Sequence, residues 1–315
     1  MNDHVSSPRI SGAAGFALAI LTALIVLGVP GPETLAPEGQ RMAAIFAVVL
    51  VLWVTEAVPV AVTALLAVVL QPMFRVGDLP TAFSTFISPV FFFVLAMFVI
   101  AQAFISSGLD RRFALWLLDK AGTDSRRVVL VFMGGTALVS TIMSDVPATA
   151  IFMAVSLGLL EKMGLTPGKS SFAKALMIGI PFAALIGGVA TPAGSSINIL
   201  GIFFIQEYGD VTVRFLDWMV IGIPMVLVML PVSVWVLLRW YPPEMTTVTA
   251  VGDVPSERAQ LGPVTAKEWR VLAILATMIV LWILSTWVEA LDVVLVSMVG
   301  AIAMFLPGMQ LFTWK

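Results

Sequence analysis

Apolar residues dominate the chain in long runs that short polar segments separate. A helix of about 20 apolar residues is long enough to cross a bilayer, and closely spaced runs of this kind are typical of proteins with many spans. The pattern therefore predicts an all-α polytopic membrane protein with about eight to ten spans. The runs cover residues 12–30, 42–54, 58–74, 89–104, 128–160, 172–205, 218–238, 271–287 and 293–306.

The run at residues 128–160 contains a polar stretch, 140–149, near its middle. Its clean apolar arms, 128–139 and 150–160, would reach only about 18 and 17 Å as helices, whereas the hydrocarbon core is about 30 Å thick. We therefore expect a re-entrant helical hairpin over residues 126–163, with its polar tip near the middle of the membrane. Irregular backbone at that depth must be buried in protein or line a wet cavity.

The run at residues 172–205 is interrupted as well. As a single helix it would be about 51 Å long, which is too long for a simple span. Glycines, Pro192 and side chains that form hydrogen bonds fill residues 187–198, so we expect a broken transmembrane helix. Two interrupted elements that lie close together in the sequence are typical of the binding site of a secondary transporter, which works by alternating access.

Composition excludes several other classes of protein. The chain has 315 residues, of which 60% are apolar and 11% are charged, and soluble domains carry about 25% charged residues. The net charge of −2 offers no basic patch for nucleic acid, and the absence of cysteine excludes disulfides and thiolate metal sites. The only histidine, His4, precedes the first run. A serine–histidine protease in the membrane would therefore lack its histidine. An aspartyl protease would lack its second aspartate, because only Asp145 lies in the membrane, and a zinc enzyme would lack its ligands, so we expect no enzyme.

The basic residues predict an orientation. If the N-terminus is cytoplasmic and residues 128–160 enter and leave on one side, fourteen of the 17 Lys and Arg residues are cytoplasmic. Only Arg41, Arg75 and Arg214 are then external, which agrees with the excess of basic residues in cytoplasmic loops of membrane proteins. We expect a multi-pass protein of the cell (inner or plasma) membrane. The tryptophans near the ends of the expected spans fit an aromatic belt: Trp218, Trp240, Trp269, Trp287 and Trp314.

Asp145 is the one acid that lies clearly inside a long apolar region. Local structure explains part of its position, because an Asp followed by a Pro at 147 is a good N-cap of a returning helix. A carboxylate at mid-membrane is also costly without a partner, which favours an additional role in binding an ion or a substrate. Glu56 lies between two apolar runs, and we interpret it as part of a solvated turn between two helices.

The order and spacing of these segments resemble the divalent anion:sodium symporter family, the INDY-like carriers of dicarboxylates, citrate or sulfate. The resemblance extends from about residue 40 to the end of the chain, and no single motif decides it. It rests on the segments 52–59, 89–112, 140–146, 194–198 and 306–315, the last of which reads Leu306-Pro307-Gly308 and closes with Phe312-Thr313-Trp314-Lys315.

Two departures from the family pattern bear on function. The hairpin tip of the family usually reads Ser-Asn-Thr, whereas this chain has Ser144, Asp145 and Val146. Such carriers also contain two inverted repeats, each with a hairpin and a broken helix, whereas this chain contains the first repeat and two further spans. We therefore expect a truncated carrier or one half of a split one.

The resemblance and the apolar pattern together predict the organisation of the chain. Residues 1–39 form a tail and the first transmembrane helix, and residues 40–240 form the first inverted repeat, which includes a helix at 215–240. Residues 241–267 form a cytoplasmic linker, and residues 268–315 begin the second repeat. We expect a homodimer in the lipid bilayer, with a small anionic substrate and no nucleic acid.

The resemblance also implies a set of binding residues. The cation site, for sodium as the coupling ion, would use Ser140, Ser144, Asp145 and the backbone at Gly194, since oxygen ligands suit a hard cation. For Gly187 and Gly188 we expect close helix packing instead of a binding role. The substrate contacts would be Ser144, Asp145, Val146, Ser195, Ser196 and Asn198.

Electrostatics predicts that the bound anion needs a compensating cation. A dianion about 4 Å from an ionised Asp145 would be repelled by roughly 4 kcal/mol per charge at an effective dielectric constant of 20. Sodium at Asp145, or a proton on it, would remove this repulsion. The sequence therefore favours a cation-coupled carrier of di- or tricarboxylates or of sulfate, with no cofactor. A sodium/proton antiporter of related architecture and a half-carrier without transport activity remain as alternatives.

Overall fold

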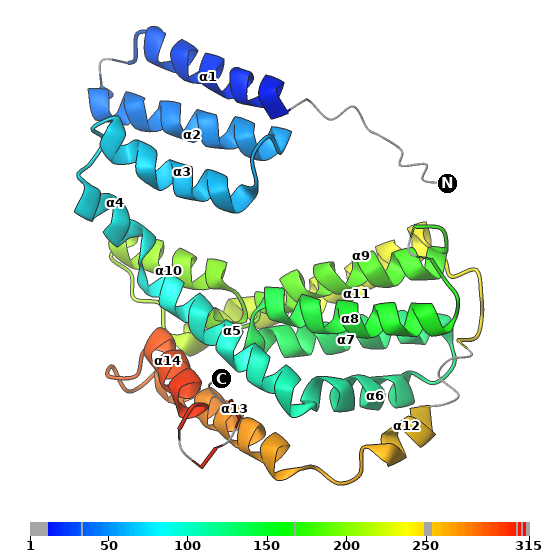
Figure 1. The fold of residues 1–315 in the computed structure, drawn as a ribbon. Coiled ribbons are helices and arrows are strands. Elements are labelled where there is room, and N and C mark those ends of the chain that lie inside the picture. Colours follow the sequence, from blue (N-terminus) through cyan, green and yellow to red (C-terminus); the bar gives the residue numbers. More distant parts are fainter. Residues whose placement is uncertain are drawn as a thin grey trace. The chain divides into compact units, whose positions relative to one another are not determined.

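A computed structural model describes residues 12–315 except 33, 167, 249–253, 307, 310 and 313–315, and it omits the side chains of 85, 86 and 255. The N-terminal tail with His4 lies outside the described residues, as do Pro307, Thr313, Trp314 and Lys315 of the closing motif. The described part is helical throughout, with only an isolated bridge between Asp124 and Thr247 in place of a sheet (Figure 1).

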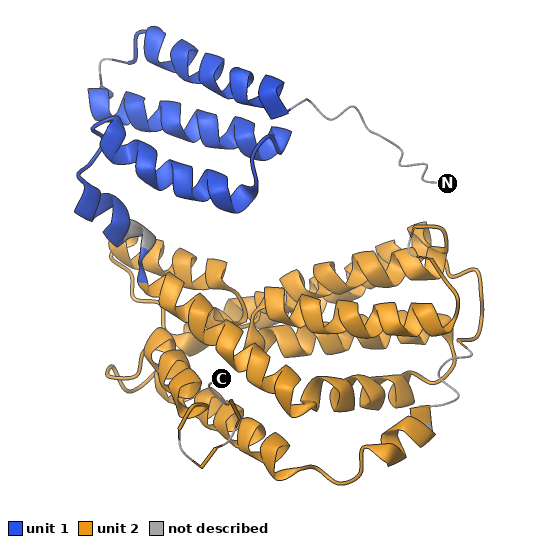
Figure 2. Cartoon of the chain, in the orientation of Figure 1, with its two compact units in different colours: residues 1–88 blue, residues 89–315 orange. Residues whose placement is uncertain are grey.

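The chain divides into two compact units, residues 1–88 and 89–315 (Figure 2). In the first unit α1 packs on α2, and α2 packs on α3. The turn predicted between α2 and α3 is confirmed, because α2 ends at Thr55 and Glu56 takes a left-handed conformation with φ 50°. The helices of this unit are α1 (Gly12–Gly28), α2 (Pro37–Thr55), α3 (Val60–Met73) and α4 (Leu79–Phe86).

The second unit contains both interrupted regions, and its helices form one buried core. Its elements are α5 (Pro89–Ser107), α6 (Leu109–Ala121), α7 (Ser125–Met143), α8 (Asp145–Lys162), α9 (Ser171–Gly188), the 3-10 turn η1 (Pro192–Gly194), α10 (Ser196–Gly209), α11 (Phe215–Trp240), α12 (Val254–Gln260), α13 (Ala266–Leu284) and α14 (Val293–Ala303).

Helix α7 lies at the centre of this unit, because it contacts α6, α8, α9 and α11. Phe132 on α7 and Phe152 on α8 are fully buried and meet edge to face, with ring centroids 6.3 Å apart. Phe113 of α6 also meets Phe152 edge to face, with ring centroids 6.1 Å apart. Aromatic pairs of this geometry stabilise a core beyond the area that they bury. The aromatic cluster therefore fixes α6 and α8 against α7.

Five helical stretches of the described chain are long and apolar enough to cross a membrane. This number is smaller than the eight to ten predicted spans, because the apolar helices α1, α3 and α14 have fewer than 18 residues. The chain is nevertheless an all-helical polytopic protein with several apolar spans. The five stretches are Pro37–Thr55, Leu79–Ser107, Ser125–Met143, Ser171–Gly188 and Phe215–Trp240.

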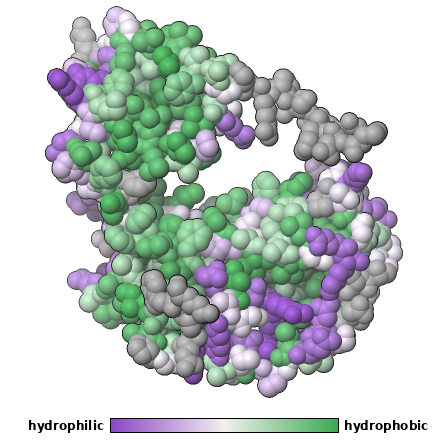
Figure 3. All heavy atoms as spheres, in the orientation of Figure 1, coloured by the Kyte–Doolittle hydropathy of each residue, from purple (hydrophilic) through white to green (hydrophobic). Residues whose placement is uncertain are grey.

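Hydrophilic residues gather on the side of the second unit where α6 and α12 lie (Figure 3). There α12 is attached to α6 by an ion pair between Arg258 and Asp119, at 2.6 Å. Glu257 pairs with Lys162 at the end of α8 and approaches Arg111 at 3.8 Å. The hydrogen bond and the positive charge from Lys162 hold the pKa of Glu257 below its ordinary value.

Arg112 forms the most buried ion pair among the described residues, with Glu268 at the start of α13. Its guanidinium donates to both carboxylate oxygens, with Nε–Oε1 at 2.7 Å and Nη2–Oε2 at 3.1 Å. It also donates to the backbone carbonyls of residues 261–263. The Glu268 side chain is 4% exposed, so its charge depends on this partner.

We predict that Arg112→Gln destabilises the fold strongly and that Arg111→Gln does not. Removing one partner of a buried pair leaves the other charge uncompensated, and because Arg112 is 22% exposed we expect a loss of about 2–4 kcal/mol in the free energy of unfolding. The side chain of Arg111 is 62% exposed, so its loss should cost less than about 1 kcal/mol. Unfolding in mixed detergent micelles measures both values, and equal losses would contradict the prediction.

Candidate functional site

Ser144 is the single residue that separates α7 from α8. It has φ 71° and ψ 153°, a conformation that is strained for a residue with a Cβ atom and that costs of order 1–3 kcal/mol. Within the polar stretch expected at the hairpin tip, residues 140–149, only Ser144 is outside the helices, because α7 continues to Met143 and α8 begins at Asp145. Within this stretch the side chains of Ser140 and Asp145 bond to the segments around α9 and α10, and Thr141 bonds to Leu138 O of its own helix.

The carboxylate of Asp145 connects the start of α8 to the segment before α10. Its Oδ1 accepts hydrogen bonds from Ser144 Oγ at 3.1 Å and from the Val146 backbone N–H at 2.9 Å. Its Oδ2 accepts one from Ser195 Oγ at 3.1 Å. Asp145 is the first residue of the helix and Ser144 holds the cap position. The sequence predicts Asp145 to be the N-cap of α8, but Ser144 takes that position. The Asp145 carboxylate accepts a hydrogen bond from the N–H of the next residue, Val146, and not from an N–H further along the helix.

The segment between α9 and α10 is irregular only over residues 189–195, which is narrower than the predicted interruption of 187–198. The carbonyl groups at the end of α9 and in this segment have no N–H partner from a continuing helix, and side chains donate hydrogen bonds to them instead. The Asn198 amide donates to Gly188 O at 2.7 Å and to Thr191 O at 2.9 Å. The Trp218 indole N–H of α11 donates to Val189 O at 2.9 Å.

Helix α7 contributes two further hydrogen bonds to this region. Ser140 Oγ donates to the Ala184 carbonyl of α9 at 2.6 Å. The Thr141 carbonyl accepts from Thr191 Oγ1, also at 2.6 Å. Because hydroxyls and carbonyls satisfy one another across these segments, α7 and the irregular segment are fixed in register.

Small residues allow these segments to approach closely. A Cβ atom at Gly187 would lie 2.3 Å from the carbonyl oxygen of Ala137 on α7, and one at Gly194 would lie 2.4 Å from the carbonyl oxygen of Gly188. Real Cβ atoms do not occur at such distances. The packing role expected for Gly187 and Gly188 is confirmed, and Gly194 takes part in the same packing.

The structure brings most of the predicted residues into one hydrogen-bonded region. Ser144 and Ser195 both donate to the Asp145 carboxylate. Gly194 lies in the adjacent irregular segment, and Ser140 and Asn198 donate to carbonyls of that segment and of the end of α9. By contrast, Val146 is 60% exposed and Ser196 is partly exposed. Within the described residues Asp145 forms no ion pair, and no group of three His, Cys, Asp or Glu residues that could hold a metal ion is found.

Sequence reasoning missed the roles of Thr191 and Trp218. Thr191 lies in the expected break and could have been singled out as a polar residue that must find a partner. For Trp218 the sequence offers no such signal, since a tryptophan at the end of an apolar run is typical of an aromatic belt. Its bond to Val189 becomes visible only when α11 is placed beside the irregular segment.

Comparison with known proteins identifies the family. Residues 12–315 match the family described as the sodium:sulfate symporter transmembrane region. The chain belongs to this family. It is therefore a polytopic membrane protein of a transporter family and not an enzyme, and the resemblance found from the sequence is confirmed.

Similar proteins support this assignment. A membrane protein of Cupriavidus necator is 28% identical over 99% of this chain, which covers 64% of that protein. The sodium-dependent dicarboxylate transporter SdcS of Staphylococcus saprophyticus is 29% identical over 95% of the chain, which covers 60% of that protein. SdcS of Staphylococcus aureus strain N315 is 30% identical over 72% of the chain, covering 45% of its length. The chain thus spans about half to two thirds of these relatives.

We predict that Gly187→Ala destabilises the fold and that Gly134→Ala, on α7, does not. The added methyl at position 187 would meet the Ala137 backbone, and overpacking of this kind costs about 1–3 kcal/mol. A Cβ at Gly134 meets nothing within 4 Å, so this variant should gain up to about 1 kcal/mol from its higher helix propensity. Unfolding in detergent measures the free energy of unfolding of both variants. If Gly187→Ala leaves this free energy unchanged, the close approach between Gly187 and the Ala137 backbone is absent.

Proposed function

We propose that this protein works as a sodium-coupled secondary active transporter of small anions, such as di- or tricarboxylates or sulfate. The observation that carries the proposal is the Asp145 carboxylate, which is 8% exposed and bonded to Ser144 and Ser195 at the junction of two helix interruptions. Buried oxygen atoms in such a junction suit a hard cation. The family and the SdcS relatives support the same conclusion.

In the membrane, α7 and α8 would form a re-entrant hairpin, and α9 and α10 would be the two parts of a broken transmembrane helix. The first turn of α7 carries Arg126 and Arg127, and the last turn of α8 carries Lys162. Helix α7 reaches the length of a span only with its charged first turn. The uncharged stretches 128–143 and 146–160 have 16 and 15 residues, and they would reach about 24 and 22 Å, which is shorter than a hydrocarbon core of about 30 Å. This length favours a tip that stops within the membrane. The distribution of the basic residues favours an N-terminus in the cytoplasm.

The cation site would consist of Ser140, Ser144, Asp145 and the backbone at Gly194. Ser144 and Asp145 contribute oxygens that already lie within hydrogen-bond distance of each other. The Ser140 hydroxyl donates to Ala184 O, which leaves the lone pairs of its oxygen as the atoms that could face a cation.

Substrate would contact Ser144, Asp145, Val146, Ser195, Ser196 and Asn198. The Asn198 amide nitrogen donates to two carbonyls, so this residue would act through its oxygen or by holding the segment in place. Val146 has no side-chain hydrogen-bonding group, and its backbone N–H donates to Asp145. Ser195 and Ser196 would then be the side-chain donors for the anion, at the start of α10, where the helix dipole favours negative charge.

Coupling to a cation follows from the charge of the site. Among the described residues no Lys or Arg bonds to Asp145, so a bound anion would face an uncompensated carboxylate. At about 4 Å the repulsion is roughly 4 kcal/mol per charge at an effective dielectric constant of 20. Sodium at Asp145, or a proton on it, would remove this repulsion and so link anion entry to a cation gradient. The protein would work as a homodimer.

Uptake of labelled succinate, citrate and sulfate into proteoliposomes tests the proposal. The protein should include any sequence encoded after Lys315, since the chain spans only 60% of the SdcS relative of Staphylococcus saprophyticus. We predict uptake of at least one anion only with an inward sodium or proton gradient. Uptake of an anion against its own gradient, without a sodium or proton gradient, would contradict the proposal. Exchange of sodium for protons with no anion present would favour the alternative function as a sodium/proton antiporter.

For Asp145→Asn we predict uptake that loses its dependence on protons and retains its dependence on sodium. An amide keeps the size and one oxygen of the carboxylate but cannot be ionised. Asp210→Asn is a matched control, because Asp210 is exposed at the end of α10 and lies outside the site. If the variant at 145 changes neither dependence, Asp145 is not a coupling residue.

A further inference from the structure

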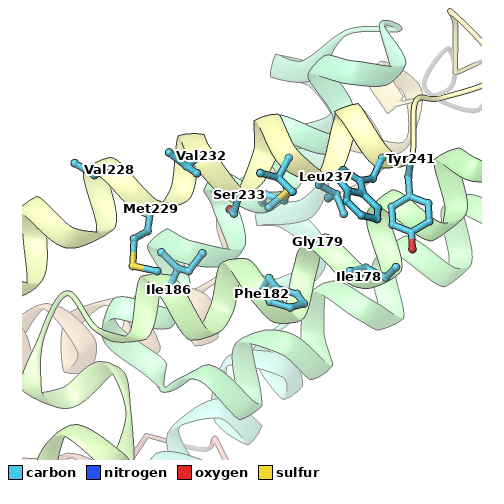
Figure 4. Close-up of a pocket in the computed structure, with 13 residues that line it drawn as sticks. Ile178, Gly179, Phe182, Ile186, Val228, Met229, Val232, Ser233, Leu237 and Tyr241 are labelled. Carbon is cyan, nitrogen blue, oxygen red and sulfur yellow. The ribbon is translucent and has the colours of Figure 1, made fainter.

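A groove of about 520 Å³ runs between α9 and α11 (Figure 4). On α9 it is lined by Ile178, Phe182 and Ile186, which follow one another every four residues and so form one stripe. On α11 its lining extends from Val228 to Tyr241 and is apolar except for the hydroxyls of Ser233 and Tyr241 and the indole N–H of Trp240. Phe182 is 56% exposed, so the groove opens on the surface of the unit.

The length of the groove fits one leaflet of a bilayer. From Val228 to Tyr241 the helix rises about 20 Å, and half of a hydrocarbon core is about 15 Å thick. Both α9 and α11 are among the helices long and apolar enough to span a membrane. An open apolar groove of this length on such helices suits a single acyl chain.

One end of the groove is polar and positively charged. Trp240 and Tyr241 lie at this end, and amphipathic rings of this kind favour the level of the lipid headgroups. Lys174 lies one turn before Ile178 on the same stripe of α9, and Arg239 is exposed next to Trp240. Within the described residues neither Lys174 nor Arg239 takes part in an ion pair.

Glu244 is the acid at this end, and its carboxylate is already engaged. It accepts hydrogen bonds from the Ser170 hydroxyl and from the Phe172 backbone N–H, the latter at 2.9 Å. These bonds outweigh the effect of its burial and hold the pKa of Glu244 below its ordinary value. The two basic side chains therefore remain available to an anionic group.

We propose that this groove binds one phospholipid with an anionic headgroup. Its acyl chain would lie between α9 and α11, and its phosphate would lie beside Lys174 and Arg239. The lipid belongs to the cytoplasmic leaflet if the orientation proposed above holds, but the site itself does not depend on that orientation.

Photolabelling in nanodiscs tests this proposal. The full chain is placed in equal amounts of phosphatidylglycerol and phosphatidylcholine, and one of the two lipids carries a photoactivatable acyl chain. Nanodiscs expose both leaflets, so the result does not depend on orientation or on transport. We predict that phosphatidylglycerol labels the peptides with Ile178–Ile186 and Val228–Tyr241 more strongly than phosphatidylcholine does.

Variants separate the headgroup from the groove. Lys174→Gln and Arg239→Gln should each lower labelling by phosphatidylglycerol about fivefold and leave labelling by phosphatidylcholine unchanged, and Lys120→Gln on α6 is the control for charge. Val232→Trp should fill the groove and abolish labelling there by both lipids. Val220→Trp is its control, because Val220 is 73% exposed on the same helix and does not line the groove.

Three results would overturn the proposal. The first is equal labelling by the two lipids, and the second is labelling that Val232→Trp does not reduce. The third is a cross-link from a photoreactive residue at position 232 to another protein segment, which would show that a second copy or a further part of the carrier covers the groove.

Discussion

The structure of the second unit depends on one constraint, which is that buried backbone groups outside regular helix need hydrogen-bond partners. Residues 189–195 interrupt the helical structure between α9 and α10, and residues 192–195 are buried. Carbonyls at the end of α9 and in this segment accept hydrogen bonds from Asn198, Trp218 and Ser140. Because these side chains come from three helices, the interruption holds α7, α10 and α11 together, and the position of Ser195 beside Asp145 follows from it.

The sequence could predict where regular structure fails, because glycines and polar residues inside long apolar runs are visible without a structure. The sequence could not predict how few residues lie outside the regular helices at these places. Ser144 alone leaves the helix between α7 and α8, since its left-handed φ is imposed by the packing of two helices and not by its own preference. Trp218 shows the same limit, because its partner Val189 is far away in sequence and is brought near only by tertiary packing. The contact between Asp145 and Ser195, by contrast, joins two residues that were both singled out from the sequence.

The charged residues follow a second rule, which is that they avoid the apolar runs and gather where helices end. There they connect neighbouring helices. Glu244 accepts hydrogen bonds at the start of α9, and Glu257 and Arg258 attach α12 to α8 and α6. Residues 241–267, the segment expected to form a linker, therefore bind to the ends of α6, α8 and α9, the last two of which are helices of the candidate site. The basic residues Lys174 on α9 and Arg239 on α11 can be read in the sequence. The groove beside them cannot, since it arises from the distance between two helices.

Asp145 explains how a cation and an anion would depend on each other in the proposed transporter. Ser195 has a single hydroxyl proton, and in this structure it donates that proton to the carboxylate. An anion could not receive a hydrogen bond from Ser195 while Ser195 donates to Asp145. Among the proposed side-chain donors this leaves the Ser196 hydroxyl, since Val146 has none. A proton on Asp145 could be donated to the Ser195 oxygen. Sodium bound at the carboxylate would weaken the hydrogen bond that the carboxylate accepts from the Ser195 hydroxyl. Either cation would then remove the negative charge and release a donor for the anion in the same step, which makes cation binding first the favoured order.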